Sequence, residues 1–247
     1  MKVYRGLNLH QEELTQIQNT GDNKLEKGSW LMKPLIDHHD KPVKEVINEL
    51  LGLGEEYLPR YNRESENPFE FGKYVTGQFL GAAIYSNDST SKDLNIVLEV
   101  DADVKDLIID GRDSLYGLSM KILKNRFSNK DLFNSLESTH GKKYIEYFSY
   151  ISELSSLQKE KIFNERDRLT DYICMDLNVI QSHLANTEVL IQGRYNTKFL
   201  SAFGLLGGIS PKKISKTHNS PAINRKTPID VISRNYNIKS TFNVYDL

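Results

Sequence analysis

The stretch KVYRGLN (residues 2–8) places an arginine inside an apolar, strand-like run. Arg5 stands between Val3 and Leu7 at alternate positions, so all three side chains face one side of the expected strand. A guanidinium buried there must be paired or must hold an anion. Two interpretations are therefore open. Arg5 either extends into water from an edge strand, or waits in a cleft for a phosphate or carboxylate.

The composition narrows the classes of protein to consider. The chain has 247 residues, 38% of them hydrophobic and 26% charged, which suits one globular domain or a domain with a large insertion. A formal net charge of -1 argues against binding of polyanions over the whole surface. The single cysteine, Cys174, rules out an internal disulfide and fits a reducing cytoplasm. Because Cys174 stands among apolar residues, we interpret it as a packing residue of a helix.

Targeting and membrane signals are not apparent in the sequence. The N-terminus lacks the long apolar core of a signal peptide. The apolar runs all fall short of the ~18 residues that a membrane span needs. We therefore expect no membrane span and a cytoplasmic location. That cytoplasm could belong to another cell, into which the protein is delivered by a route that the sequence does not reveal.

Strand patterns stand on both sides of a helical middle. Residues 2–8, 73–77, 94–110 and 188–206 have strand-type patterns and are expected to pair in one mixed or antiparallel core. Apolar residues recur at helical spacing from about 112 to 184. This order predicts a single α+β domain over residues 1–247 with a long helical insertion, and not alternating βαβ units.

Shorter patterns complete the expected organisation. Helices are expected at residues 10–18 and 41–54, and a small-residue helix is expected directly after the strand at 73–77. The glycine-rich run GLLGG (204–208) lacks the context of a phosphate loop and predicts a turn. Residues 210–236 combine prolines with lysines and arginines, which predicts a loop with one or two short elements.

Metal binding is not expected from the histidines. His38, His39 and Asp40 are consecutive, so their side chains point to different sides of any regular element, and no second cluster has suitable spacing. His140 and His183 are isolated in the helical middle, where surface or packing roles are the simpler interpretation.

Five short motifs follow one another along the chain: Tyr4-Arg5-Gly6, Tyr74-Val75-Thr76, Ala82-Ala83-Ile84-Tyr85, Leu98-Glu99-Val100 and Glu188-Val189-Leu190. With these motifs in this order, the chain resembles the ADP-ribosyltransferase superfamily, specifically its arginine–serine–glutamate branch of toxin-like mono-ADP-ribosyltransferases. The resemblance implies a split mixed or antiparallel β core and says nothing of the long helical middle.

Two positions depart from the pattern of that branch. Thr76 stands where serine is usual; it keeps the hydroxyl and adds a methyl group. Asn186, two residues before Glu188, stands where members that modify arginine carry Glu or Gln. Since that residue helps to select the acceptor, Asn186 argues against arginine as the modified residue.

The resemblance implies an enzyme that uses NAD as a substrate, without a metal. Glu188 would hold a ribose hydroxyl and stabilise the oxocarbenium-like charge that develops as the nicotinamide–ribose bond breaks. Arg5 would bind the diphosphate with its bidentate fork. Gly6 would leave room for the carboxamide to bond to the backbone.

Three more residues complete the implied NAD site. Thr76 would orient the ribose or Glu188 by hydrogen bonding. An aromatic side chain would stack on the nicotinamide ring, and the chain offers two candidates for this role: Phe79 and Tyr85.

The acceptor of the ADP-ribose stays open. A macromolecule is expected, a protein rather than a nucleic acid, and the helical middle is expected to shape its access. One alternative is an NAD glycohydrolase, with water as the acceptor, and another is a non-catalytic interaction protein. A third is a nucleic-acid modifier or binder that uses the basic residues near the end of the chain: Lys212, Lys213, Lys216, Arg225 and Lys226. A solvated loop explains these residues as well, because no aromatic residues stand between them.

Overall fold

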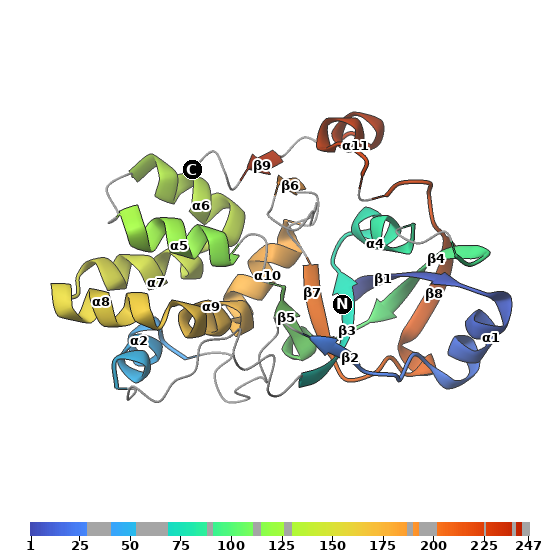
Figure 1. Ribbon diagram of the computed structural model, residues 1–247, viewed down its shortest axis with the longest axis horizontal. Coiled ribbons are helices and arrows are strands. Elements are labelled where there is room, and N and C mark those ends of the chain that lie inside the picture. The colour runs from blue at the N-terminus through green and yellow to red at the C-terminus, as the bar shows by residue number, and fades with distance from the viewer. Residues whose placement is uncertain are drawn as a thin grey trace.

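The computed structural model describes residues 1–28, 41–52, 69–87, 91–110, 115–125, 130–186, 190–192, 202–224, 226–238 and 241–243. Within these ranges the chain forms an α+β fold in which an antiparallel sheet lies beside a block of helices (Figure 1). The α+β class predicted from the sequence is confirmed.

In the described part of the chain, the main sheet has seven strands, in the order β5-β7-β3-β1-β4-β8 with β2 paired to β3. Every pairing in it is antiparallel. The strands are β1 (Lys2–Leu9), β2 (Glu26–Gly28), β3 (Phe69–Thr76), β4 (Leu94–Asp101), β5 (Leu107–Ile109), β7 (Ala202–Leu206) and β8 (Ile214–Asn219). Strands that precede and follow the helical middle are thus neighbours in one core, as the sequence predicts.

One part of the predicted core lies elsewhere. β6 (Leu190–Gln192) pairs in parallel with β9 (Thr241–Asn243) in a separate two-stranded sheet. The prediction that all of 188–206 joins the main sheet is therefore wrong for residues 190–192. A strand of three residues carries too few side chains for its pattern to reveal which partner it takes. Residues 187–189 and 193–201 lie outside the described part of the chain.

Between β5 and β6 the described residues form six helices: α5 (Leu115–Asn125), α6 (Lys130–His140), α7 (Lys142–Ser152), α8 (Ser156–Asn164), α9 (Arg166–Met175) and α10 (Leu177–Ala185). The predicted helical middle is confirmed. The block gathers beyond the β5 end of the sheet, where α9 and α10 contact β5 (Figure 1). Cys174 is buried on α9, which confirms it as a packing residue.

The other predicted helices are present as α1 (Gln11–Thr20), α2 (Val43–Gly52) and α4 (Phe79–Ser86). None of the helices in the described ranges has both the length and the apolar character to cross a membrane.

The end of the chain is more regular than predicted. Residues 210–236 contain the 3-10 turn η2 (Pro211–Lys213), strand β8 and helix α11 (Ile229–Tyr236). β8 is polar and stands last in the strand order, so it lacks the apolar alternation that identifies a half-buried strand. The predicted turn at 204–208 is wrong for 204–206, which belong to β7; the chain turns at Gly207, where φ is +75°.

β1 lies in the interior of the sheet, between β3 and β4. Val3 is fully buried in the main core and Leu7 packs against that core. Arg5, on the same side of the strand, is 8% exposed. The interpretation of Arg5 as an edge-strand side chain that extends into water is therefore wrong.

β1 and β3 diverge after a single pair. β1 pairs with β4 over its whole length but with β3 only at Tyr4 opposite Thr76. Met1 and Ala102 exchange both backbone hydrogen bonds at 2.9 Å. Odd-numbered residues of β1 therefore direct their main-chain groups to β4, and even-numbered residues direct theirs to β3. The main-chain N–H and C=O groups of Gly6 therefore point to the β3 side, where Tyr74 would stand opposite by register but β3 has moved away and forms no pair with β1 there. This divergence creates the candidate site.

α4 lies directly on β1 at Gly6. A Cβ atom at Gly6 would stand 1.8 Å from the carbonyl oxygen of Ala82 in α4. Only a residue without a side chain permits that approach. Tyr4 and Phe79 pack beside this contact in a second, smaller core.

Candidate functional site

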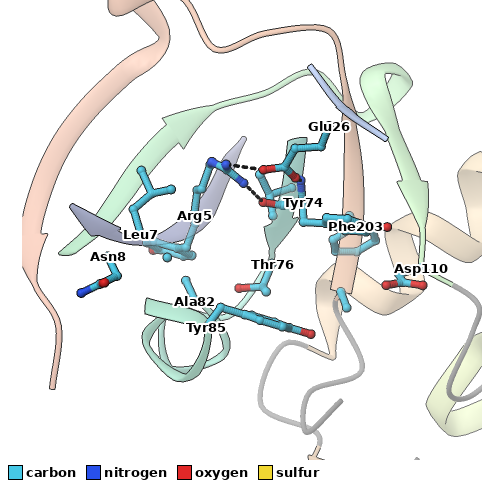
Figure 2. A pocket seen from close by; sticks show the side chains of 14 residues that line it. Arg5, Leu7, Asn8, Glu26, Tyr74, Thr76, Ala82, Tyr85, Asp110 and Phe203 are labelled. Carbon is cyan, nitrogen blue, oxygen red and sulfur yellow. Dashed lines mark hydrogen bonds and ion pairs between the residues drawn. The ribbon is translucent and has the colours of Figure 1, made fainter. Parts of the chain in front are cut away.

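A cavity of about 460 Å³ opens where β1 and β3 diverge (Figure 2). Its walls come from β1, β3, α4 and β7, from Glu26 in β2 and from the residue that follows β5. The volume is within the range of pockets that hold small organic ligands, about 300–1,000 Å³. The split in the sheet thus provides a cavity of useful size.

Four of the predicted site residues line this one cavity. Arg5 and Gly6 come from β1, Thr76 from the end of β3 and Tyr85 from α4. Tyr85 is 37% exposed and so lies at the rim. Residues far apart in the sequence are therefore brought together at the divergence of the strands.

Of the other two predicted residues, Phe79 lies outside this arrangement, and the position of Glu188 is not described. The Phe79 ring lies edge-on against Tyr4 at 5.8 Å and against His218 at 5.3 Å, measured between ring centroids, and it does not belong to the described lining. Of the two aromatic candidates, the geometry favours Tyr85. Glu188 falls outside the described residues, as do His38–Asp40 and Arg225.

Arg5 is paired on three sides. Its Nε donates to Asp22 Oδ2 at 2.7 Å and its Nη2 donates to Glu26 Oε1 at 2.6 Å. Its Nη1 donates to the carbonyl oxygen of Tyr74 at 3.0 Å. Two carboxylates and one backbone carbonyl thus compensate the burial of the guanidinium.

Arg5 and Glu26 together bridge the gap between β1 and β3. The other oxygen of Glu26 accepts a hydrogen bond from the Tyr74 N–H at 3.1 Å. Both main-chain groups of Tyr74 are therefore bonded to side chains, one to Arg5 and one to Glu26. These bonds replace part of the ladder that the strands do not form here.

The two carboxylates around Arg5 are not equivalent. Asp22 also pairs with Lys73, and its side chain is 12% exposed while that of Lys73 is 3% exposed. The Glu26 side chain is 31% exposed and lines the cavity. Asp22, held between two buried cations, is part of the framework. Glu26 is the partner that an incoming anion can replace.

The Thr76 hydroxyl is oriented by its own chain. Its Oγ1 donates to the carbonyl oxygen of Gln78 at 2.5 Å, and the residue is 3% exposed. With the proton used in this bond, the oxygen's lone pairs remain for accepting a hydrogen bond. Thr76 is therefore suited to accept a hydrogen bond from a ligand hydroxyl.

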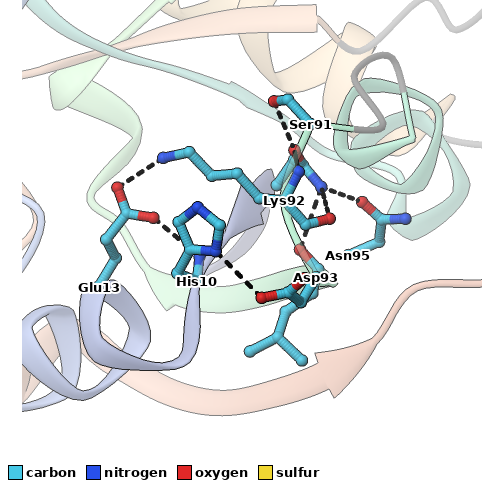
Figure 3. Close-up of polar contacts among 8 residues, drawn as sticks. His10, Glu13, Ser91, Lys92, Asp93 and Asn95 are labelled. Carbon is cyan, nitrogen blue, oxygen red and sulfur yellow. Dashed lines mark hydrogen bonds and ion pairs between the residues drawn. The ribbon is translucent and has the colours of Figure 1, made fainter.

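Asn8, near the far end of β1, bonds to the segment before β4, in which Lys92 bonds in turn to Glu13 of α1 (Figure 3). Its Nδ2 donates to Asn95 Oδ1 at 2.7 Å and to the Lys92 carbonyl at 3.1 Å, and its Oδ1 accepts from the Lys92 N–H at 3.1 Å. Helix α1 reinforces this corner because Lys92 Nζ donates to Glu13 Oε1 at 2.5 Å. The Asn8 amide therefore holds the turn before β4.

Three carboxylates at or beside the cavity were not predicted from the sequence. Asp22 and Glu26 lie in a short polar segment without a periodic pattern, so nothing in the sequence points to Arg5 as their partner. Asp110 follows the fully apolar strand β5 and lines the cavity with a residue exposure of 7%. An acidic residue directly after an apolar strand was the one available signal.

Comparisons with protein-family models, with curated proteins and with solved structures find no match for the chain.

Proposed function

We propose that the chain is an NAD-dependent ADP-ribosyltransferase that cleaves the nicotinamide–ribose bond and transfers ADP-ribose to a macromolecular acceptor. The observation that carries this proposal is the meeting of Arg5, Gly6, Thr76 and Tyr85 in one cavity. The divergence of β1 and β3 also agrees with the split β core that the resemblance implies.

Each of the four residues offers NAD a group of matching chemistry. Arg5 supplies a cation for the diphosphate, once Glu26 gives way. The main-chain groups of Gly6 on the open edge of β1 offer a donor and an acceptor to a planar carboxamide. Tyr85 offers a ring face to nicotinamide, and Thr76 accepts a hydrogen bond from a ribose hydroxyl.

Glu188 is the carboxylate that this proposal assigns to the ribose. Its charge would stabilise the oxocarbenium-like transition state, which is an interaction made mainly after binding. Glu188→Gln should therefore bind NAD within a few-fold of the parent protein while turnover falls roughly 100–1000-fold. Glu160→Gln, at an exposed position of α8, is the matched control and should leave turnover unchanged.

The activity itself is tested by nicotinamide release. The protein is incubated with NAD, with and without a cell lysate, and labelled NAD identifies the modified molecules. Release that needs the lysate supports transfer, with a labelled protein or nucleic acid as the acceptor. Release without lysate points to a glycohydrolase. If no NAD is consumed under any of these conditions, the enzymatic proposal is wrong and a binding role takes its place.

A further inference from the structure

Asp110 directly follows β5 and extends the pairing of β5 with β7. Its main-chain N–H donates to the Ala202 carbonyl at 2.8 Å, which continues the pairing of Ile109 with Phe203. The residue is 7% exposed and lines the cavity. Backbone pairing and burial thus hold a carboxylate at a defined place in the site.

Asp110 and Arg5 stand on opposite sides of the cavity, with Thr76 between them (Figure 2). Two carboxylate residues occur in the described lining, Glu26 and Asp110. Glu26 stands on the Arg5 side and bonds to Arg5 and Tyr74. Asp110 alone among the described lining residues brings a carboxylate to the other side.

NAD has a matching separation of charge. Its diphosphate is anionic, whereas its nicotinamide ring is a cation that lies one ribose away. A molecule whose diphosphate meets Arg5 and whose ribose meets Thr76 directs its cationic ring toward Asp110. In this pose the carboxamide does not bond to Gly6, which lies beside Arg5 on β1. Tyr85 lies in the same part of the cavity as a face for that ring (Figure 2).

We propose that Asp110 is a catalytic carboxylate that binds the cationic nicotinamide riboside and stabilises the positive charge as it moves from the ring to the ribose. This inference rests on the proposed function and adds a residue that the sequence motifs do not include.

The charges in this step balance without a further reactant. The bond between the ring nitrogen and the ribose C1′ breaks, its electron pair stays with nitrogen, and neutral nicotinamide leaves. The acceptor then forms a bond to C1′ and releases its proton to solvent. Asp110 takes part in no bond and no proton transfer in this step, and its effect is electrostatic.

The first test compares turnover in two aspartate variants. Asp110→Asn keeps the size of the side chain and removes its charge, so NAD turnover should fall roughly 100–1000-fold. Asp106→Asn is the matched control, because Asp106 lies four positions away, pairs with Lys213 at 3.5 Å and is outside the described cavity lining. It should turn over NAD like the parent. Thermal unfolding of both variants verifies that they are folded.

The second test measures binding without any reaction. The probes are neutral nicotinamide and the N-methylnicotinamide cation, which have nearly the same shape. The parent should bind the cation at least several-fold more tightly, and Asp110→Asn should lose this preference. Asp110→Glu, which restores the charge, should recover part of it.

The outcomes separate this inference from the proposed function. If Asp110→Asn is folded, consumes NAD like the parent and keeps the preference for the cation, the inference is overturned and the proposed function stands. If the parent binds both probes equally, the inference is also overturned, whatever the variants do. A preference that depends on Asp110 in a parent that never consumes NAD supports the cation subsite and overturns the proposed function.

Discussion

Arg5 and Glu26 bond to each other at 2.6 Å and to opposite main-chain groups of the same residue, Tyr74. The pair therefore closes the sheet where β1 and β3 diverge and at the same time forms one wall of the cavity. Since Glu26 presents a carboxylate to the guanidinium, it occupies the place that an anionic ligand needs. Binding of an anion at Arg5 must compete with Glu26.

Replacement of Glu26 by glutamine should tighten the binding of NAD. The variant keeps an acceptor for the Tyr74 N–H and removes the negative charge that competes for Arg5. A hydrogen bond to a charged group is worth about 1.5–3 kcal/mol, so we expect a dissociation constant about tenfold lower. Titration calorimetry with NAD measures it; unchanged or weaker binding would contradict the role given to Glu26.

Asp22→Asn is the control for that experiment. Asp22 pairs with both Arg5 and Lys73, and both of these cations are buried. Loss of its charge should lower the free energy of unfolding by about 3–5 kcal/mol, because two buried cations lose a partner. Urea denaturation monitors this loss, which Glu26→Gln should not show to the same degree.

Gly6→Ala should destabilise the protein. The new Cβ atom would collide with the Ala82 carbonyl, so α4 must move away from β1. Overpacking of this kind costs about 1–3 kcal/mol. Gly52→Ala, at the end of α2, is the control because a Cβ atom there meets nothing within 4 Å. Urea denaturation of both variants measures the difference; equal stability would show that α4 adapts without cost.

The Thr76 hydroxyl should matter more than its methyl group. Thr76→Ser keeps the bond to the Gln78 carbonyl and should bind NAD within a few-fold of the parent. Thr76→Val leaves that carbonyl without its partner and removes the acceptor from the cavity, which should cost stability by about 1–3 kcal/mol. Thermal unfolding and NAD titration test the two variants in parallel. A valine variant that behaves like the serine variant would exclude a role for the hydroxyl.

The strands around Arg5 were predictable because apolar alternation is a local property of the chain. The side of β1 on which Arg5 lies also followed from that alternation, and it is confirmed by the burial of Val3. The pairing of Arg5 with Asp22 and Glu26 was not predictable, since an ion pair depends on where a polar segment folds and such a segment has no pattern to read. Lys73 shows the same limit: it is a lysine in a strand, yet it is 3% exposed.

The candidate site was predictable in part for a similar reason. The resemblance selected Arg5, Gly6 and Thr76, which line the cavity. It could not select Asp110, which belongs to none of the matched motifs and reaches the cavity only because β5 pairs with β7 across the long helical block. When two strands on either side of an insertion pair, the sequence around each strand carries no pattern that identifies the other.

Stability should fall with pH below about 6.5 because of a buried histidine pair. His140 Nδ1 lies 3.0 Å from His183 Nε2, and both residues are fully buried. Burial, and secondarily the charge of His183, hold the pKa of His140 well below its usual value. The unfolded chain therefore takes up protons at a pH where the folded protein does not, and the free energy of unfolding decreases as pH falls.

The size of this effect is measurable by urea denaturation between pH 7.5 and 5.5. One histidine that stays neutral in the folded state costs up to about 1.4 kcal/mol for each pH unit below 6.5. His140→Asn keeps a nitrogen near the position of Nδ1 and does not titrate, so its stability should depend less on pH. An equally steep dependence in the variant would assign the effect to other groups.

The position of β7 between β3 and β5 has a consequence for folding during synthesis on the ribosome. β3 and β5 are synthesised before the helical block, whereas the strand that joins them is synthesised after it. Until β7 emerges, both strands present open edges to other nascent chains. A truncated transcript or a protease cut that ends the chain after α10 therefore yields an aggregation-prone fragment. A separately supplied C-terminal fragment that contains β7 can pair with the open edges of β3 and β5 in that fragment.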